Sequence, residues 1–288
     1  LALTYLNCQN NQLQSLDVSN NLALTYLNCQ NNQLQSLDVN QNLALTYLAC
    51  GYNSQFNSVD VSQNLALTKF YCQSNQLTSL DVSNNLALTH LYLFDSQITS
   101  LDVSLNLALT FLGCQNNQLT SLNVSNNTAL VFLDCADNQF TSLDISSNLA
   151  LAELKCGSNP LDSLNVSNNL ALTYLMCNSI ALTSLDVSAN LALTFLNCHS
   201  NQLSNLDVSN NTNLTDLSCS YNALTTLNVS NGNNVNMILL ANGNNNLLCI
   251  EVDDVSWSTS NWTVAGTNID AWMSFSTDCS TAFGCTDN

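Results

Sequence analysis

The chain has 288 residues, of which 46% are hydrophobic and only 8% charged, and its 20 acidic and 2 basic residues give a formal net charge of −18. Proteins bind nucleic acids and anionic lipid surfaces through many Lys and Arg contacts to phosphate. The chain has only two basic residues, Lys69 and Lys155, so both classes of partner are excluded. No apolar run is long enough to predict a transmembrane segment.

A repeat begins with the first residue. The stretch LALTYLNCQNNQLQSLDV fills residues 1–18 and returns unchanged at 22–39, which gives a period of 21 residues. The unit reads L-xx-L-x-C-xx-N-x-L-xx-L-D-V-S-x-N, and its leading leucine recurs from Leu3 to Leu214, with one residue inserted near 54–56. Because the chain starts in mid-repeat and without Met, we expect it to be a fragment of a longer protein.

Each unit is nearly doubled, since Leu3-xx-Leu6-x-Cys8-xx-Asn11 is echoed by Leu13-xx-Leu16-x-Val18-xx-Asn21. Each half predicts a short alternating strand followed by a bend, and no half has a helical period. We therefore predict a mainly β repeat solenoid of about twelve coils over residues 1–252, with a parallel strand on each of two sides and little or no helix. One coil cannot bury its apolar face alone, so neighbouring coils stabilise each other.

Two columns of asparagine mark the bends, one continuing from Asn11 and the other from Asn21. An Asn side chain at a bend can satisfy backbone groups of its own coil and of the next one. We interpret both columns as structural.

Ten of the 13 cysteines form a third column, and leucine takes the same position at Leu93 and Leu240. The leucines indicate that this position faces the core. We expect a stack of buried free thiols that pack as small apolar groups. A chain of metal–thiolate sites and a partly oxidised ladder are the alternatives. The column contains Cys8, Cys29, Cys50, Cys72, Cys114, Cys135, Cys156, Cys177, Cys198 and Cys219.

The outward positions of the first strand are where the repeat changes most, and they change most in coils 4 to 8. Exposed aromatic groups beside hydrogen-bonding groups suit a sugar ring or a protein hot spot. Drift in a solvent-exposed column is the alternative, with aromatic side chains stabilising each other between coils. The candidate ligand-binding residues are Lys69, Tyr71, His90, Tyr92, Phe94, Phe111, Phe132, Asp134, Glu153 and Lys155.

The outward face of the second side hardly changes and carries a column of carboxylates between serines. A structural role, weak calcium association, and a regular face for ice or mineral are all compatible with it. No D-x-D-x-D-G loop is present, so any calcium site would be weak or shared between coils. The candidate ligands are Asp17, Asp38, Asp60, Asp81 and Asp102, and no other cofactor is expected.

The L-xx-L-x-C-xx-N-x-L core over residues 1 to about 252 resembles the leucine-rich repeat, with Cys where Leu is usual, and LDVSxN is similar to its short bacterial form. The segment LLCIEVDDVSWSTSNW…NIDAWMSFSTDC at 247–279 resembles the end of such arrays in secreted Bacteroidetes surface proteins. This resemblance implies a secreted or surface-attached bacterial protein that serves in binding or adhesion, with the strand face as ligand surface.

The end of the array is expected to be a capping segment over 253–280, with 281–288 starting a further module or a linker. Cys249 and Cys279 lie outside the cysteine column, and we predict that they form a disulfide that fastens the cap to the last coil. Cys285 is expected to pair within the following module.

We find no converging set of Ser, His, Asp or Cys that would predict an enzyme, since His90 and His199 are far apart in sequence. The sequence favours a non-catalytic extracellular module that binds a protein or glycan through the strand face of the middle coils. The alternative is a structural stalk or filament segment, in which copies of the chain assemble and the value of the array is its length and stiffness.

Overall fold

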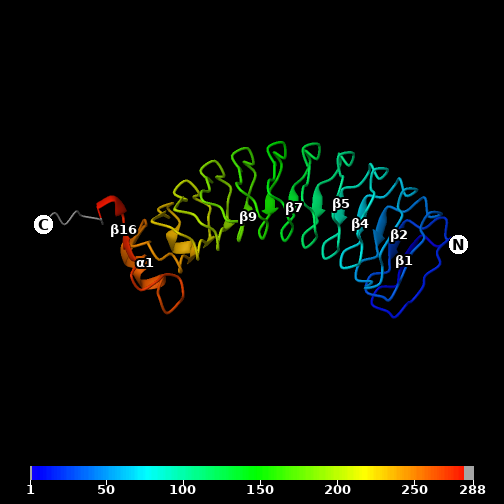
Figure 1. The fold of residues 1–288 in the computed structure, drawn as a ribbon, viewed down its shortest axis with the longest axis horizontal. Coiled ribbons are helices and arrows are strands. Elements are labelled where there is room, and N and C mark those ends of the chain that lie inside the picture. Colours follow the sequence, from blue (N-terminus) through cyan, green and yellow to red (C-terminus); the bar gives the residue numbers. More distant parts are fainter. Residues whose placement is uncertain (1, 282–288) are drawn as a thin grey trace. The chain divides into compact units, whose positions relative to one another are not determined.

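The computed structural model describes residues 2–281 (Figure 1). Their contacts divide the chain into two compact units, Leu1–Leu151 and Ala152–Asn288, and each unit contains a stack of coils. Within the described residues no helix is long and apolar enough to cross a membrane. The residues predicted to begin a further module, with Cys285, lie outside the described part except for Thr281.

The first unit is built on three-residue parallel strands, one in each coil. Neighbouring strands pair in register, so that Tyr5 faces Tyr26 and Leu6 faces Leu27. The middle residue of each strand points into the core, and Leu27, Leu48 and Phe70 are fully buried. The strands described in this unit are β1 (Tyr5–Asn7), β2 (Tyr26–Asn28), β3 (Tyr47–Ala49), β4 (Lys69–Tyr71), β5 (His90–Tyr92), β6 (Phe111–Gly113) and β7 (Phe132–Asp134).

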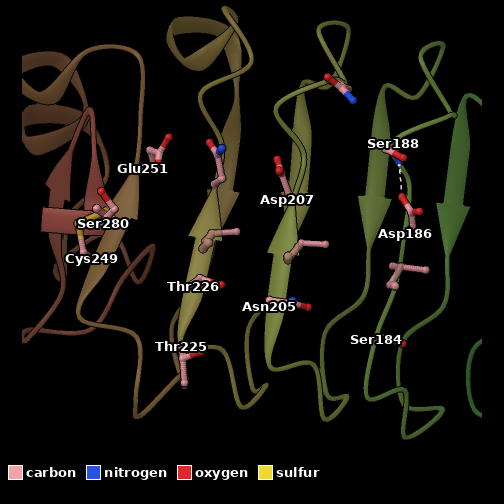
Figure 2. A pocket seen from close by; sticks show the side chains of 16 residues that line it. Ser184, Asp186, Ser188, Asn205, Asp207, Thr225, Thr226, Cys249, Glu251 and Ser280 are labelled. Carbon is pink, nitrogen blue, oxygen red and sulfur yellow. Dashed lines mark hydrogen bonds between the residues drawn. A yellow bond between two sulfur atoms is a disulfide. The ribbon is translucent and has the colours of Figure 1, made fainter. Parts of the chain in front are cut away.

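The second unit continues the same pattern and adds strands on the other side of the coils. Its first-side strands are β8 (Glu153–Lys155), β9 (Tyr174–Met176), β10 (Phe195–Asn197), β12 (Asp216–Ser218) and β14 (Ile238–Leu240). Its second-side strands are β11 (Asn205–Asp207), β13 (Thr226–Asn228), β15 (Cys249–Glu251) and β16 (Ser274–Ser276), which pair in that order (Figure 2). A 3-10 turn, η1, spans Asn234–Asn236.

The prediction of a second-side strand in every coil is wrong, because among the described residues these strands form only near the carboxyl-terminal end. In earlier coils the second side is held by isolated bonds, such as Gln33 N–H to the Leu13 carbonyl at 2.9 Å. Farther on, a continuous ladder forms in which Leu206 pairs with Leu227, Leu227 with Ile250, and Ile250 with Phe275.

Asparagine side chains hold the coils together, as predicted. The Asn53 amide donates to the Cys29 carbonyl of the preceding coil at 3.3 Å and to the Cys50 carbonyl of its own coil at 3.0 Å. Its oxygen accepts the Leu34 N–H at 3.0 Å. In the other column, Asn42 donates to Val18 and Asn21 carbonyls of the preceding coil, each at 3.0 Å.

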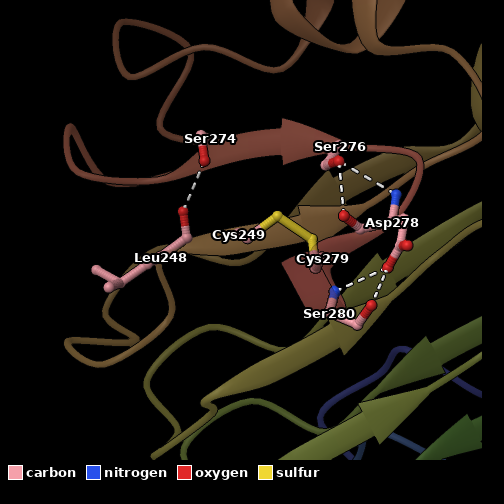
Figure 3. The surroundings of a disulfide bond; sticks show 7 residues. All are labelled: Leu248, Cys249, Ser274, Ser276, Asp278, Cys279 and Ser280. Atoms are coloured by element: carbon pink, nitrogen blue, oxygen red, sulfur yellow. Dashed lines mark hydrogen bonds between the residues drawn. A yellow bond between two sulfur atoms is a disulfide. The ribbon is translucent and has the colours of Figure 1, made fainter. Parts of the chain in front are cut away.

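The end of the array folds over the last coil as a cap. It contains the helix α1 (Val255–Asn261), capped by the Asp254 carboxylate on the Trp257 N–H, and a 3-10 turn, η2 (Cys279–Thr281). The Ala241 N–H donates to the Asn268 carbonyl at 2.7 Å, so the cap adds a further turn to the stack. The predicted disulfide is present: Cys249 and Cys279 are bonded, with Cα atoms 5.8 Å apart (Figure 3).

Candidate functional site

The candidate site is the outward face of strands β4 to β7 in the first unit. Parallel pairing in register places Lys69 beside His90, His90 beside Phe111, and Phe111 beside Phe132. A second outward column runs alongside through Tyr71, Tyr92, Gly113 and Asp134. Seven of the predicted ligand-binding residues therefore lie on these four adjacent strands. An eighth, Phe94, follows β5 at its bend and is half-buried.

The aromatic side chains on this face stack on one another along the coils. The ring centroids of His90 and Phe111 are 4.5 Å apart with planes 17° from parallel. Those of Tyr71 and Tyr92 are 5.3 Å apart at 7°. A stacked ring presents its edge to solvent and covers its face with a neighbour. The rings are therefore placed to make edge contacts and, for tyrosine, hydroxyl hydrogen bonds.

The Tyr92 ring leans across the next coil, over Gly113 of its own column. A Cβ built on Gly113 would lie 2.7 Å from Cδ1 of the Tyr92 ring, so only glycine leaves room for the ring there. The ring reaches to 6.4 Å from the Phe132 ring, two coils away. Tyr92 thus joins the two outward columns into one aromatic patch.

The basic and titratable groups of the face are few. The imidazole of His90 shares a 2.9 Å hydrogen bond between Nδ1 and the Thr89 hydroxyl. Burial, together with the neighbouring Lys69 charge, lowers the pKa of His90 from its ordinary value. His90 is therefore neutral near pH 7, and Lys69 provides the positive charge of this part of the face.

Of the remaining predicted residues, one is more buried than expected and two lie on the predicted outward column but in the second unit. Asp134 is only 8% exposed, and its carboxylate accepts the Ala136 N–H at 3.3 Å, so it is a buried bend residue rather than an open one. Glu153 and Lys155 belong to β8, the first strand of the second unit. There the ammonium of Lys155 lies 5.5 Å from the centroid of the Tyr174 ring.

The carboxylate column of the second side serves its own bends. In each of Asp17, Asp60 and Asp81 the Oδ1 atom accepts the N–H of the serine two residues later, at 2.8–2.9 Å. The same bond is made by Asp38 to Asn40 and by Asp102 to Ser104. Among residues 2–281 no group of three or more His, Cys, Asp or Glu side chains converges as a metal site. Calcium association at this column stays a prediction.

The cysteine column consists of free thiols, and all of its members except the half-buried Cys8 are buried. The thiols of Cys29 and Cys72 each donate to a carbonyl of the next coil, at 3.5 Å. Burial, reinforced by the neighbouring Cys8, raises the pKa of Cys29 to about 12. Protonated, enclosed thiols of this kind are poor nucleophiles near neutral pH.

A groove that the sequence did not reveal lies on the second side of the second unit (Figure 2). It has a volume of about 710 Å³ and is lined by residues of four neighbouring coils and of the cap, including Asp186, Asp207, Thr226, Glu251 and Ser280. Its lining contains no Lys or Arg. The repeat alone could not indicate this groove, because η2 of the cap provides one of its walls.

Solved structures with a similar fold include bacterial leucine-rich repeat proteins. The functional domain of InlJ from Listeria monocytogenes, which includes a cysteine ladder, is 35% identical, with a TM-score of 0.72 over 88% of this chain and 60% of that one. A Leptospira interrogans leucine-rich repeat protein (23% identity, TM-score 0.75, 87% and 66% covered) and the Listeria monocytogenes internalin InlF (23%, 0.71, 95% and 79%) share the fold.

The chain thus spans about 60% of the InlJ structure. No protein-family model matches the sequence, and no curated protein matches it. The InlJ domain includes a cysteine ladder, and this chain has a column of cysteines. The resemblance to Bacteroidetes proteins stays an expectation.

Proposed function

Because the chain is a leucine-rich repeat solenoid of the bacterial kind, we propose that it is a non-catalytic, extracellular adhesion module whose strand face binds a protein. The proposed surface is the aromatic patch, defined as Tyr71, His90, Tyr92, Phe111 and Phe132. Phe94 and Lys69 lie at its borders. In this proposal the regular core is a rigid support, and the outward residues that vary between coils recognise the ligand.

The observation that carries the proposal is the stacking of the rings. A sugar is held by an aromatic group through the open face of the ring, and here the faces of His90, Phe111, Tyr71 and Tyr92 pack on each other. Ring edges, tyrosine hydroxyls and a single lysine instead resemble the aromatic centre of a protein interface, in which Tyr and Arg or Trp dominate binding energy. We therefore favour a protein ligand over a glycan.

The patch is also pre-organised for binding. Its side chains are half-buried and in contact before any ligand arrives, so little conformational entropy is lost when a partner docks. The gap beside Gly113 fixes the position of the Tyr92 ring. A partner surface without strong negative charge is expected, since the chain carries a net charge of −18.

The test is a binding screen of the whole chain against arrays of purified matrix and cell-surface proteins and of glycans, with and without calcium. A Tyr71→Ala, Tyr92→Ala, Phe94→Ala variant is compared with a control in which Ser36, Ser58 and Ser79 on the second side are changed to Ala. We expect a protein ligand that the parent and the control bind and that the aromatic variant loses. Equal binding by all three chains, or no protein ligand at all, would overturn the proposal.

A further inference from the structure

A row of exposed leucines runs along one edge of the first unit, away from the strand face. The edge is the bend that leads from the second side of one coil to the first-side strand of the next. On five consecutive coils its leucine is 59–63% exposed: Leu22, Leu43, Leu65, Leu86 and Leu107. The leucine two residues later in each bend, such as Leu24, is fully buried. We call the exposed row the leucine edge.

The exposure does not follow from a requirement of the bend. Two tight turns shape it, with the Asn21 N–H bonded to the Val18 carbonyl and the Leu24 N–H bonded to the Asn21 carbonyl. The side chain of Leu22, between the two turns, is exposed to solvent and takes no part in the hydrogen bonds of either turn. In another coil of this unit the same position is the exposed Thr128, so a polar residue fits there equally well. Repeated exposed leucine is costly to leave in water and marks an interaction surface.

The leucine edge is also free of charge. The bends at 19–25, 40–46, 62–68, 83–89 and 104–110 contain no Asp, Glu, Lys or Arg, in a chain with 20 acidic residues. The carboxylate column lies on the second side instead, beginning at Asp17 and Asp38. Two copies of a chain with a net charge of −18 repel each other wherever their carboxylates face one another. The leucine edge is a surface at which two copies can approach without apposing those charges.

We infer that the leucine edge is a self-association surface, and that its occupant is the leucine edge of a second copy of this chain. A second copy brings the same row of side chains at the same spacing of about 4.8 Å per coil. Leucines of one copy can then lie between those of the other over several coils, whichever direction the copies run. A partner with a different fold would need apolar groups that happen to have the same spacing.

The association should be reversible and weak for one pair of chains. A standard stable interface buries about 800 Å² on each partner and has a compact apolar centre, whereas the leucine edge is a narrow row. Salt screens the repulsion between the two acidic chains without weakening apolar contact. Dimerisation is therefore expected to strengthen as the NaCl concentration rises, the opposite of an interface held by ion pairs.

The test is sedimentation equilibrium of the full chain up to about 1 mM, at low and high NaCl. The variant is Leu43→Thr, Leu65→Thr, Leu86→Thr, which uses the residue already present at Thr128 and so keeps the bend. The control is Gln12→Ser, Gln33→Ser, Gln97→Ser, at exposed positions of the opposite bend. Unfolding transitions of all three chains establish that each is folded.

We expect the parent and the control to dimerise, more tightly at high NaCl, and the leucine variant to dimerise at least about tenfold more weakly. A parent that stays monomeric throughout, or a leucine variant that associates like the parent, overturns the inference. The aromatic patch is intact in the leucine variant, so loss of self-association with retained ligand binding separates this inference from the proposed function.

Discussion

The ring of Tyr92 occupies the space that a side chain at position 113 would fill, with its Cδ1 atom 2.7 Å from the place of a Gly113 Cβ. This relationship links two neighbouring coils within one outward column. A residue with no side chain therefore helps to position a ring of the aromatic patch.

Changing Gly113 to Ala should displace the Tyr92 ring and cost about 1–3 kcal/mol of unfolding free energy, as overpacking does. The measurement is urea unfolding, as a double-mutant cycle with Tyr92→Ala. In the Tyr92→Ala background the Gly113→Ala change should be nearly neutral, because the ring is gone. An equal cost in both backgrounds would show that the ring and the glycine are not coupled.

Replacing Asn53 by Ala should destabilise the solenoid by about 1–3 kcal/mol, because the buried Leu34 N–H is left without its acceptor. The carbonyls of Cys29 and Cys50 each lose one donor but keep a second, from Asn32 and Asn75. The matched control is Asn84→Ala, because Asn84 is exposed and donates one 3.3 Å bond to the Ser62 carbonyl. Chemical denaturation measures both. Similar losses for the two variants would mean that the buried amide is not what binds the coils.

The buried cysteines should resist alkylation while the chain is folded. Burial disfavours the thiolate and raises the pKa of Cys29 and Cys198 to about 12, so almost no thiolate exists at pH 8. Iodoacetamide followed by peptide mass spectrometry should label the column in urea but, in the native chain, only the half-buried Cys8 at an appreciable rate. Rapid native labelling of Cys50 or Cys114 would contradict a closed thiol core.

The carboxylate column predicts a loss of stability in acid. Hydrogen bonds from the Ser83 hydroxyl and N–H lower the pKa of Asp81, and the corresponding serines do the same for Asp17 and Asp102. A carboxyl whose pKa is lower when folded stabilises the fold above its unfolded value, about 3.9, and that contribution disappears as the pH falls through the folded value. Urea midpoints measured between pH 6 and pH 2 should therefore decline below pH 4.

The serine that causes this shift can be tested separately. In a Ser83→Ala variant the pKa of Asp81, followed by NMR titration of its side-chain carboxyl, should rise toward the ordinary value because the hydroxyl donor is lost. Ser79→Ala, two positions before Asp81 on the same face, is the control and should change it less. A pKa that stays where it was in Ser83→Ala would assign the shift to the backbone bond alone.

Much of the fold could be predicted because it depends on a period and on local chemistry. Leu24, Cys29 and Asn42 lie at fixed steps of the 21-residue unit, so their inward direction follows from the repeat, and all three are fully buried. The Cys249–Cys279 bond was also predictable, since these two cysteines fall outside the column and flank the last segment. The second-side strands were overpredicted, because alternation alone does not determine whether neighbouring backbones pair.

What the sequence by itself determined is the direction of each side chain, because strand pairing in register converts position in the unit into a column. What only the tertiary structure decided is how outward side chains of neighbouring coils pack against one another. Tyr92 leans over Gly113, the rings of His90 and Phe111 cover each other, and Asp134 turns into its own bend. These outcomes depend on side-chain rotamers and on residues one or two coils away, which are 21 or more positions distant in sequence and adjacent only once the coils are stacked.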